Sequence, residues 1–290
     1  MDRAAALSTW FQDRSNALGL ARVDLPRQPR CVALGFDGSD QSLEAATWAA
    51  HLGQDVHVVT GLDISAAVFL PAEEAPLTPA WAESIRSHVD EANPALAEHL
   101  SGCEVKHHVL ETGPSRAMMQ TARDANADIM VVGSQGKGWL QRATLGSVAE
   151  ALCHHAEPPV LVSRGPWRAG PIVAGVGEDP GSSAAVAWAA RLALMWDRDL
   201  VLAHAAHGVP EPRTIDTTGP RASLAAIPWP PKAGFQELAE EIDPALLVVG
   251  HRTSRRWLGS TAVSLIRNAP CSVLVARGAG AASSASSGGA

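Results

Sequence analysis

The 290-residue chain is 46% hydrophobic and 18% charged, with 23 Lys and Arg against 30 Asp and Glu. This length suits about two domains, and the net charge of −7 argues against a groove that neutralises nucleic-acid phosphates. No apolar run reaches the ~18–20 residues that span a bilayer, and the charged N-terminal segment is unlike a signal peptide. A cytoplasmic protein without a membrane or nucleic-acid partner is therefore expected, in keeping with scattered cysteines that form no CxxC pair.

Short apolar runs and segments of helical period alternate along the first half of the chain. Strands are expected at residues 31–36, 55–61, 105–111, 128–133 and 158–163. Helices are expected at residues 5–20, 42–52, 85–100, 113–126 and 145–156. Ser42 is the expected N-cap of the second helix, and Pro94 predicts a kink or break in the third. This alternation indicates βαβ units and a parallel sheet.

The chain also contains an internal repeat. Residues 32–50 align with residues 172–190 without a gap, and Trp48 then meets Trp188. Further matches follow in the same order: 129–133 with 246–250, 139–140 with 257–258, 146–147 with 259–260, and 160–165 with 273–278. We infer a duplicated α/β domain, flavodoxin-like or Rossmann-like in each copy.

The second copy is shorter than the first. Residues 207–234 are rich in Pro and Gly and lack a clear period, so they are expected to form an irregular loop that replaces the long helix and one strand. The expected domains are residues 30–165 and 170–278. Residues 1–29 form an N-terminal extension, and residues 279–290 form a disordered tail.

A glycine-rich loop follows the apolar strand at 129–133. Gly133 is followed by two residues and Gly136, then by nine residues, Gly146 and Ser147, which opens a helix. Glycine lets the backbone approach an anion closely, so that successive N–H groups can point at it. The start of the helix adds unpaired N–H groups and a positive dipole end. This spacing indicates a phosphate-binding loop.

A second group of polar residues follows the first strand at the same edge of the sheet. Asp37, Gly38 and Ser39 end that strand, and Gly61 ends the next one. Parallel sheets bind ligands beyond the carboxyl ends of their strands. The Asp37 carboxylate could accept hydrogen bonds from ribose hydroxyls there, while Gly38 lets a nucleotide lie close to the backbone.

The Gly-x2-Gly-x9-Gly-Ser spacing and the early Asp-Gly-Ser turn resemble the nucleotide-binding signature of the universal stress protein family. The resemblance covers most of residues 30–165 and, more weakly, residues 170–278. It implies an adenine nucleotide alpha hydrolase-like fold, a role in stress response, and binding of ATP or another adenine nucleotide, with Mg²⁺ as a candidate companion ion. The implied nucleotide-binding residues are Asp37 at the ribose or base, Gly61 at the adenine, Gly133, Gly136, Gly146 and Ser147 at the phosphates, and the adjoining Gly38, Ser39 and Val148.

The second copy departs from that pattern. Gly177 stands where the first copy has Asp37, Thr253 stands where it has Gly136, and five residues rather than nine separate Thr253 from Gly259. We therefore expect one nucleotide per chain, bound in the first half. The resemblance also implies that the last strands of the two copies, at 159–162 and 272–275, pair antiparallel in an intramolecular pseudo-dimer, with further homo-oligomers open.

Three interpretations of the glycine loop remain open. It could serve an ATP-binding regulator, a weak ATPase, or a scaffold whose nucleotide site is vestigial; Asp37 could simply start a turn or cap a helix. The regulator is favoured over the enzyme because the chain has no GxSxG, HExxH or GxxxxGK[ST] motif. No metal site is expected, since His107-His108 and the run from Cys153 to His155 lack ligand spacing.

Overall fold

The computed structural model describes residues 2–18, 23–62, 78–135, 145–177, 180–208, 211, 213–216, 221–251 and 259–277. It divides into two compact units. The first unit comprises residues 29–168 and 266–274, and the second comprises residues 1–28, 169–265 and 275–290. The expected disordered tail lies outside the described residues.

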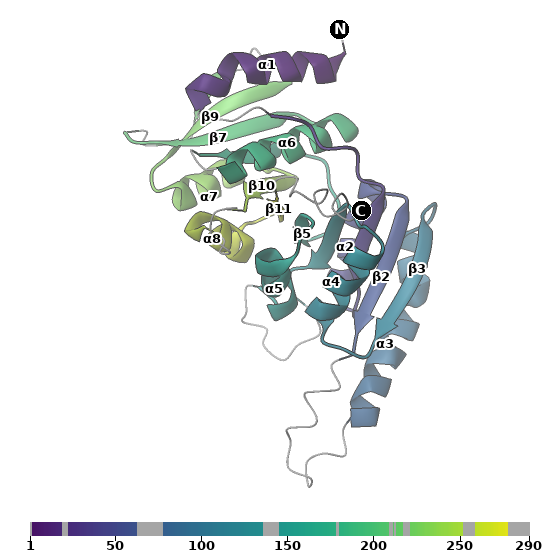
Figure 1. Cartoon of the computed structure of the whole chain (residues 1–290). Helices are drawn as coiled ribbons and strands as arrows, with labels where there is room; N and C mark the ends of the chain where they lie inside the picture. The colour runs from purple at the N-terminus through teal and green to yellow at the C-terminus, as the bar shows by residue number, and fades with distance from the viewer. Residues whose placement is uncertain are drawn as a thin grey trace, which may run out of the picture. The chain divides into compact units, whose positions relative to one another are not determined.

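The first unit is built on five parallel strands in the order β3-β2-β1-β4-β5 (Figure 1). These strands are β1 (Cys31–Gly35), β2 (Asp55–Gly61), β3 (Glu104–Leu110), β4 (Ile129–Gly133) and β5 (Val160–Ser163). Its helices are α2 (Asp40–Leu52), α3 (Thr78–His99), α4 (Pro114–Asp124) and α5 (Ser147–His155). α2 packs on α3, and α4 packs on α5. This pairing follows from right-handed crossovers. The connections through α2 and α3 cross the sheet toward β3, those through α4 and α5 cross it toward β5, and the two directions place their helices on opposite faces.

Both faces of the central strands are buried, as the continuous apolar runs predict. Val32, Ala33 and Leu34 of β1 are inaccessible to solvent, and β4 is buried as far as Val132. Trp48 of α2 is 1% exposed, and its indole N–H donates to the Gly165 carbonyl at 3.0 Å. Packing in the core therefore explains the tryptophan that both repeats contain.

The second unit repeats this pattern with strands in the order β10-β6-β7-β9-β8, of which β8 alone is antiparallel to its neighbour. Its strands are β6 (Ile172–Val176), β7 (Leu200–Ala206), β8 (Arg213–Asp216), β9 (Ala222–Pro228) and β10 (Leu246–Gly250). Its helices are α1 (Arg3–Leu18), α6 (Pro180–Met195) and α7 (Pro231–Ile242), and α8 (Ser260–Asn268) and β11 (Ser272–Ala276) follow along the chain.

The expectation of an irregular loop at residues 207–234 is wrong. β9 pairs parallel with β7 over seven residues, as β3 pairs with β2 in the first unit, and β8 pairs antiparallel with β9. The segment ASLAAIP has small side chains that fit against a neighbouring strand, but its flanking Pro and Gly residues obscured the strand pattern. The described residues between β7 and β9 contain no helix, in agreement with that part of the prediction.

Two local predictions about helices also require correction. The N-cap of α2 is Ser39, whose hydroxyl accepts the Ser42 N–H at 3.2 Å, so Ser42 lies inside the helix. α3 continues through Pro94, so the break that was one of the two expected outcomes does not occur. A proline removes one helical hydrogen bond, and the burial of Leu96 and Leu100, each at most 2% exposed, outweighs that loss.

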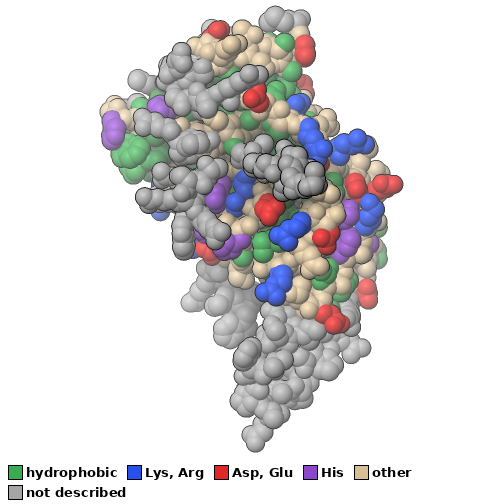
Figure 2. Space-filling model, in the orientation of Figure 1, with side chains coloured by type: hydrophobic (Ala, Val, Ile, Leu, Met, Phe, Trp, Pro, Cys, Tyr) green, Lys and Arg blue, Asp and Glu red, His purple; other side chains and the backbone are tan. Residues whose placement is uncertain are grey.

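Charged side chains of both signs lie interspersed on the face drawn in Figure 2. Apolar and polar side chains separate them, and the coloured part of that face shows no continuous basic stripe. A stripe of that kind is what tracks a nucleic-acid backbone, so the surface seen there fits the acidic net charge of the chain.

Candidate functional site

The carboxyl ends of β1 and β4 lie side by side in the middle of the first unit. The two strands are parallel neighbours, with Leu34 opposite Val131. The chain leaves β1 toward β2 and β3 on one side, and it leaves β4 toward β5 on the other. The loops after β1 and β4 therefore separate at a topological switch point, which is where open parallel sheets form ligand crevices.

The turn after β1 is organised by the Asp37 carboxylate. Asp37 Oδ1 accepts the Ser39 backbone N–H at 3.0 Å and the Ser39 hydroxyl at 2.6 Å. Gly38 has φ of +73°, a left-handed conformation that favours glycine. Ser39 in turn caps α2, which begins at Asp40 with its side chain exposed. Asp37 thus takes part in a helix-capping turn and also presents a half-buried carboxylate at the switch point.

Gly61 is held between the end of β2 and the start of α4. A Cβ added there would lie 2.5 Å from the Pro114 Cα and 2.9 Å from the Thr112 carbonyl oxygen. The neighbouring Thr60 hydroxyl donates to the Phe36 carbonyl at 2.8 Å, which ties the ends of β1 and β2 together. Only glycine fits at residue 61, because the backbone before α4 fills the space that a side chain would need.

Gly133 has a comparable packing role, and so does its counterpart in the second unit. A Cβ on Gly133 would lie 2.9 Å from the Gln41 carbonyl oxygen at the start of α2. A Cβ on Gly250 would lie 2.8 Å from the Gly181 Cα at the start of α6, and closer still to the Gly181 carbonyl. Gly133 therefore lets α2 approach the sheet, and Gly250 does the same for α6, whether or not a phosphate binds nearby.

The glycine-rich loop returns to the sheet at Gly146. The Gly146 N–H donates to the Ser134 carbonyl at 2.7 Å, and α5 begins at the next residue. Gly146 is the N-cap of α5, and no side chain caps the helix. The N–H groups of the first turn point out of the helix start, where Ser147 is exposed and Val148 half-buried. Gly136 lies outside the described residues, as does the rest of 136–144.

The second unit has a different turn at the equivalent position. The Gly177 N–H donates to the buried Ser182 hydroxyl at 2.9 Å, and residue 177 supplies no carboxylate. Asp37 and Gly177 thus end equivalent strands with different chemistry. Thr253 and the rest of residues 252–258 lie outside the described part of the chain.

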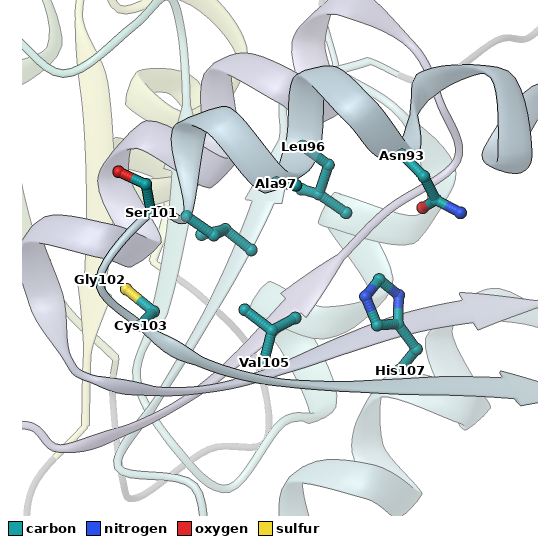
Figure 3. A pocket seen from close by; sticks show the side chains of 9 residues that line it. Asn93, Leu96, Ala97, Ser101, Gly102, Cys103, Val105 and His107 are labelled. Carbon is teal, nitrogen blue, oxygen red and sulfur yellow. The ribbon is translucent and has the colours of Figure 1, made fainter.

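A cavity of about 470 Å³ lies elsewhere in the first unit, between α3 and β3 (Figure 3). Leu96 of α3 faces Val105 and His107 of β3 across it. The Asn93 Oδ1 at one side is buried with no hydrogen-bond partner among the described residues, and burial raises the pKa of the Cys103 thiol. None of the predicted site residues lines this cavity, and no sequence motif predicted it.

The strand register also brings together a cluster that the sequence did not predict. Cys31, Asp55 and His57 place their ligand-type atoms within 4.8 Å of one another at the amino ends of β1 and β2. Residue spacing alone could not reveal it, since Cys31 and Asp55 become neighbours only when β1 pairs with β2. His108, for which the sequence spacing predicted no metal ligation, hydrogen-bonds to His57.

The sequence of this chain is similar to those of known proteins. The model of the universal stress protein family matches residues 30–164 and 218–277. A universal stress protein of Methanocaldococcus jannaschii is 34% identical over 144 residues, which cover 47% of this chain and 82% of that protein. One from Mycobacterium tuberculosis is 27% identical over 254 residues, which cover 82% of this chain and 85% of that protein.

The fold is shared with a universal stress protein from Archaeoglobus fulgidus. That crystal structure matches with a TM-score of 0.63 at 17% identity and covers 86% of this chain and 97% of its own. Within the described residues, no helix is both long and apolar enough to cross a membrane. The family model covers more than half of the chain and matches parts of both repeats. The chain therefore belongs to the universal stress protein family.

Proposed function

We propose that the first unit binds an adenine nucleotide, with Mg-ATP as the first candidate, in a cytoplasmic protein of stress response or regulation. The observation that carries this proposal is the switch point itself, where the Asp37 turn lies at the end of β1 and the loop after β4 leads into an α5 start without a side-chain cap. The proposed nucleotide-binding residues are Asp37, Gly38, Ser39, Gly61, Gly133, Gly136, Gly146, Ser147 and Val148.

Each end of this crevice suits a different part of a nucleotide. Asp37 Oδ1 accepts both Ser39 bonds, and a ribose hydroxyl would donate to the same carboxylate. The first N–H groups of α5, at Ser147 and Val148, suit phosphate oxygens because a helix start carries a partial positive charge. A hydrogen bond to a charged group is worth about 1.5–3 kcal/mol, roughly ten- to a hundredfold in affinity.

The nine residues carry different weight in the proposal. Gly61 and Gly133 are required for packing against neighbouring helices, so their presence alone does not argue for a ligand. Asp37 and Ser147 carry the chemical argument, together with Gly136 and Gly146 of the loop spacing. The second unit has no carboxylate at residue 177, which favours a single nucleotide in the first unit.

A pair of charge-matched variants tests the proposal. Asp37→Asn keeps an Oδ1 that can accept both Ser39 bonds, but it changes the second oxygen to an N–H donor. Asp40→Asn removes the same charge three residues away from an exposed side chain. In isothermal titration with Mg-ATP, Asp37→Asn should weaken binding about tenfold, and Asp40→Asn should bind as the parent protein does. Equal affinity in both variants would remove Asp37 from the proposed site, and no adenine-nucleotide binding by the parent chain would favour the scaffold instead.

The proposal extends to the packing of the two repeats. The short apolar strands β5 and β11 end the two copies, and edge strands of this kind need cover. We propose that they pair antiparallel in an intramolecular pseudo-dimer, as the family resemblance implies. A crystal structure should place the two strands in contact; strands that neither touch each other nor face another chain would contradict the pairing.

A further inference from the structure

A compact group of polar side chains lies at the amino ends of β1, β2 and β3. Cys31 and Asp55 begin their strands and are register partners. His57 lies two residues after Asp55 and therefore projects from the same face of the sheet. Its register partner on β1 is Ala33, a small residue that leaves room above the sheet. The Cys31 Sγ, a carboxylate oxygen of Asp55 and a ring nitrogen of His57 lie within 4.8 Å of one another.

We propose that Cys31, Asp55 and His57 form a binding site for a transition-metal ion with the preferences of Zn²⁺. Thiolate, imidazole and carboxylate are the ligand types that Zn²⁺ takes, and three protein ligands with a water molecule complete a tetrahedral site. In such a site, nitrogen and oxygen ligands at about 2.1 Å from the metal lie about 3.4 Å from each other. The His57 Nε2 and Asp55 Oδ1 are 3.5 Å apart, so these two ligands already have the required spacing.

His108 completes the outer shell of this site. The His57 Nδ1 lies 2.9 Å from the His108 Nε2, and the two rings stack nearly parallel. A metal on His57 Nε2 requires the ring proton on Nδ1, which would then donate to His108. With the His108 Nε2 as the acceptor, this hydrogen bond keeps the ring proton on His57 Nδ1 and leaves His57 Nε2 for a metal.

Backbone contacts position the thiol. The Asp128 Oδ2 accepts the Cys31 N–H at 3.1 Å and the Arg30 N–H at 2.9 Å, which fixes the start of β1. The Cys31 Sγ–H donates to the Ala125 carbonyl at 3.5 Å. Ala125 is the C-cap of α4, and the partial negative charge of a helix C-terminus favours a cation nearby.

Lys106 forms an ion pair with the Asp55 carboxylate. Its Nζ lies 2.9 Å from Asp55 Oδ1, and its side chain is 52% exposed. The ammonium group can leave into solvent when a divalent ion takes its place. Lys106 is therefore a competitor for Asp55, and its removal should tighten metal binding by up to about fivefold, the upper range for an exposed ion pair.

The metal site is independent of the proposed nucleotide site. Its ligands lie at the amino ends of β1 and β2, whereas the nucleotide site is proposed at the carboxyl ends of β1 and β4. Failure of one proposal therefore leaves the other intact. Metal titrations in the absence of nucleotide and nucleotide titrations in the presence of a chelator keep the two outcomes distinguishable.

Cobalt titration of the reduced full-length chain tests the site directly, because a Co²⁺–thiolate bond gives a charge-transfer absorption band. The band should reach its maximum at one Co²⁺ per chain, and Zn²⁺ should displace the Co²⁺. Cys31→Ser should abolish the band, and His57→Gln should weaken Co²⁺ binding at least tenfold. Cys103→Ser, at another half-buried thiol of the same unit, should leave the band unchanged.

Stability gives a second readout for the same variants. A ligand that binds only the folded state raises the melting temperature, so Zn²⁺ should raise it for the parent chain and more strongly for Lys106→Met. The shift should disappear in His57→Gln, a variant that also answers the question if Cys31→Ser does not fold. A band that persists in Cys31→Ser, no band in the parent chain, or weaker binding in Lys106→Met would overturn the proposal.

Discussion

The glycines that end the two VVG strands offer a sharp test of what the sequence motif means. If they exist for helix packing, alanine should destabilise both units by amounts that follow the space available. A Cβ on Gly133 meets the Gln41 carbonyl oxygen at 2.9 Å and the Gln41 carbonyl carbon at 3.0 Å, so the backbone at the start of α2 must shift to admit it. A Cβ on Gly250 collides with three backbone atoms of Gly181, which can yield only if the first turn of α6 moves.

The expected change in the free energy of unfolding combines a stabilising and a destabilising effect. Replacing glycine by alanine restricts the unfolded chain and stabilises by about 0.4–1 kcal/mol where no clash occurs, whereas overpacking costs about 1–3 kcal/mol. For Gly133→Ala the closest contacts are longer than at Gly250, so a smaller net loss of about 1 kcal/mol in the free energy of unfolding is expected. For Gly250→Ala the overpacking cost lies at the upper end of that range. The free energy of unfolding should therefore fall by about 2 kcal/mol, which lowers the melting temperature by about 4–8 °C.

Differential scanning calorimetry of the nucleotide-free chain measures this difference. Gly177→Ala is the matched control, because among the described residues a Cβ there meets only the Ser182 hydroxyl, at an ordinary 3.6 Å. It should leave the melting temperature unchanged or slightly raised. A Gly250→Ala variant as stable as the parent chain, or one no worse than Gly133→Ala, would refute the packing explanation for this glycine.

Three further predictions concern other parts of the chain. Trp48→Phe removes a fully buried indole and its bond to the Gly165 carbonyl, so chemical denaturation should show a loss of about 2–4 kcal/mol. The hydrogen bond from Lys106 lowers the pKa of Asp55 below its ordinary 3.8, so this carboxylate stabilises the fold above that pH and its contribution is lost as pH falls further. Urea denaturation should therefore show a shallower acid limb for Asp55→Asn, and an unchanged limb would contradict this. Gly136→Val should weaken nucleotide binding in fluorescence titrations and leave the melting temperature unaltered.

The sequence predicted the strands well because parallel strands buried on both faces leave uninterrupted apolar runs. The strand expected at 128–133 is β4, which begins one residue later, and Trp48 is a core residue as its repetition suggested. The strand β9 was missed because small residues and nearby prolines resemble a loop. The N-cap of α2 was misplaced by three residues, since two serines of equal capping propensity stand near the start of the helix.

The site shows a different limit of sequence-based reasoning. The sequence predicted Asp37, Gly61 and Gly133 as ligand-binding residues, and the structure gives all three a packing or turn role. A glycine at a strand end can be required for the close approach of a helix, so a glycine pattern by itself does not distinguish packing from ligand binding. Strand register created the Cys31 and Asp55 pair across 24 residues of sequence, and no local pattern could have predicted it.

The number of nucleotides bound per chain tests whether the first unit alone binds a nucleotide. Native mass spectrometry of the full chain with Mg-ATP, at concentrations near saturation of the tighter site, counts bound molecules without assuming a model of binding. One nucleotide per chain is expected in the parent protein and in Gly177→Ala, with strongly reduced occupancy in Asp37→Asn. Two nucleotides per chain, or one nucleotide that Asp37→Asn retains in full, would contradict the assignment of the site to the first unit.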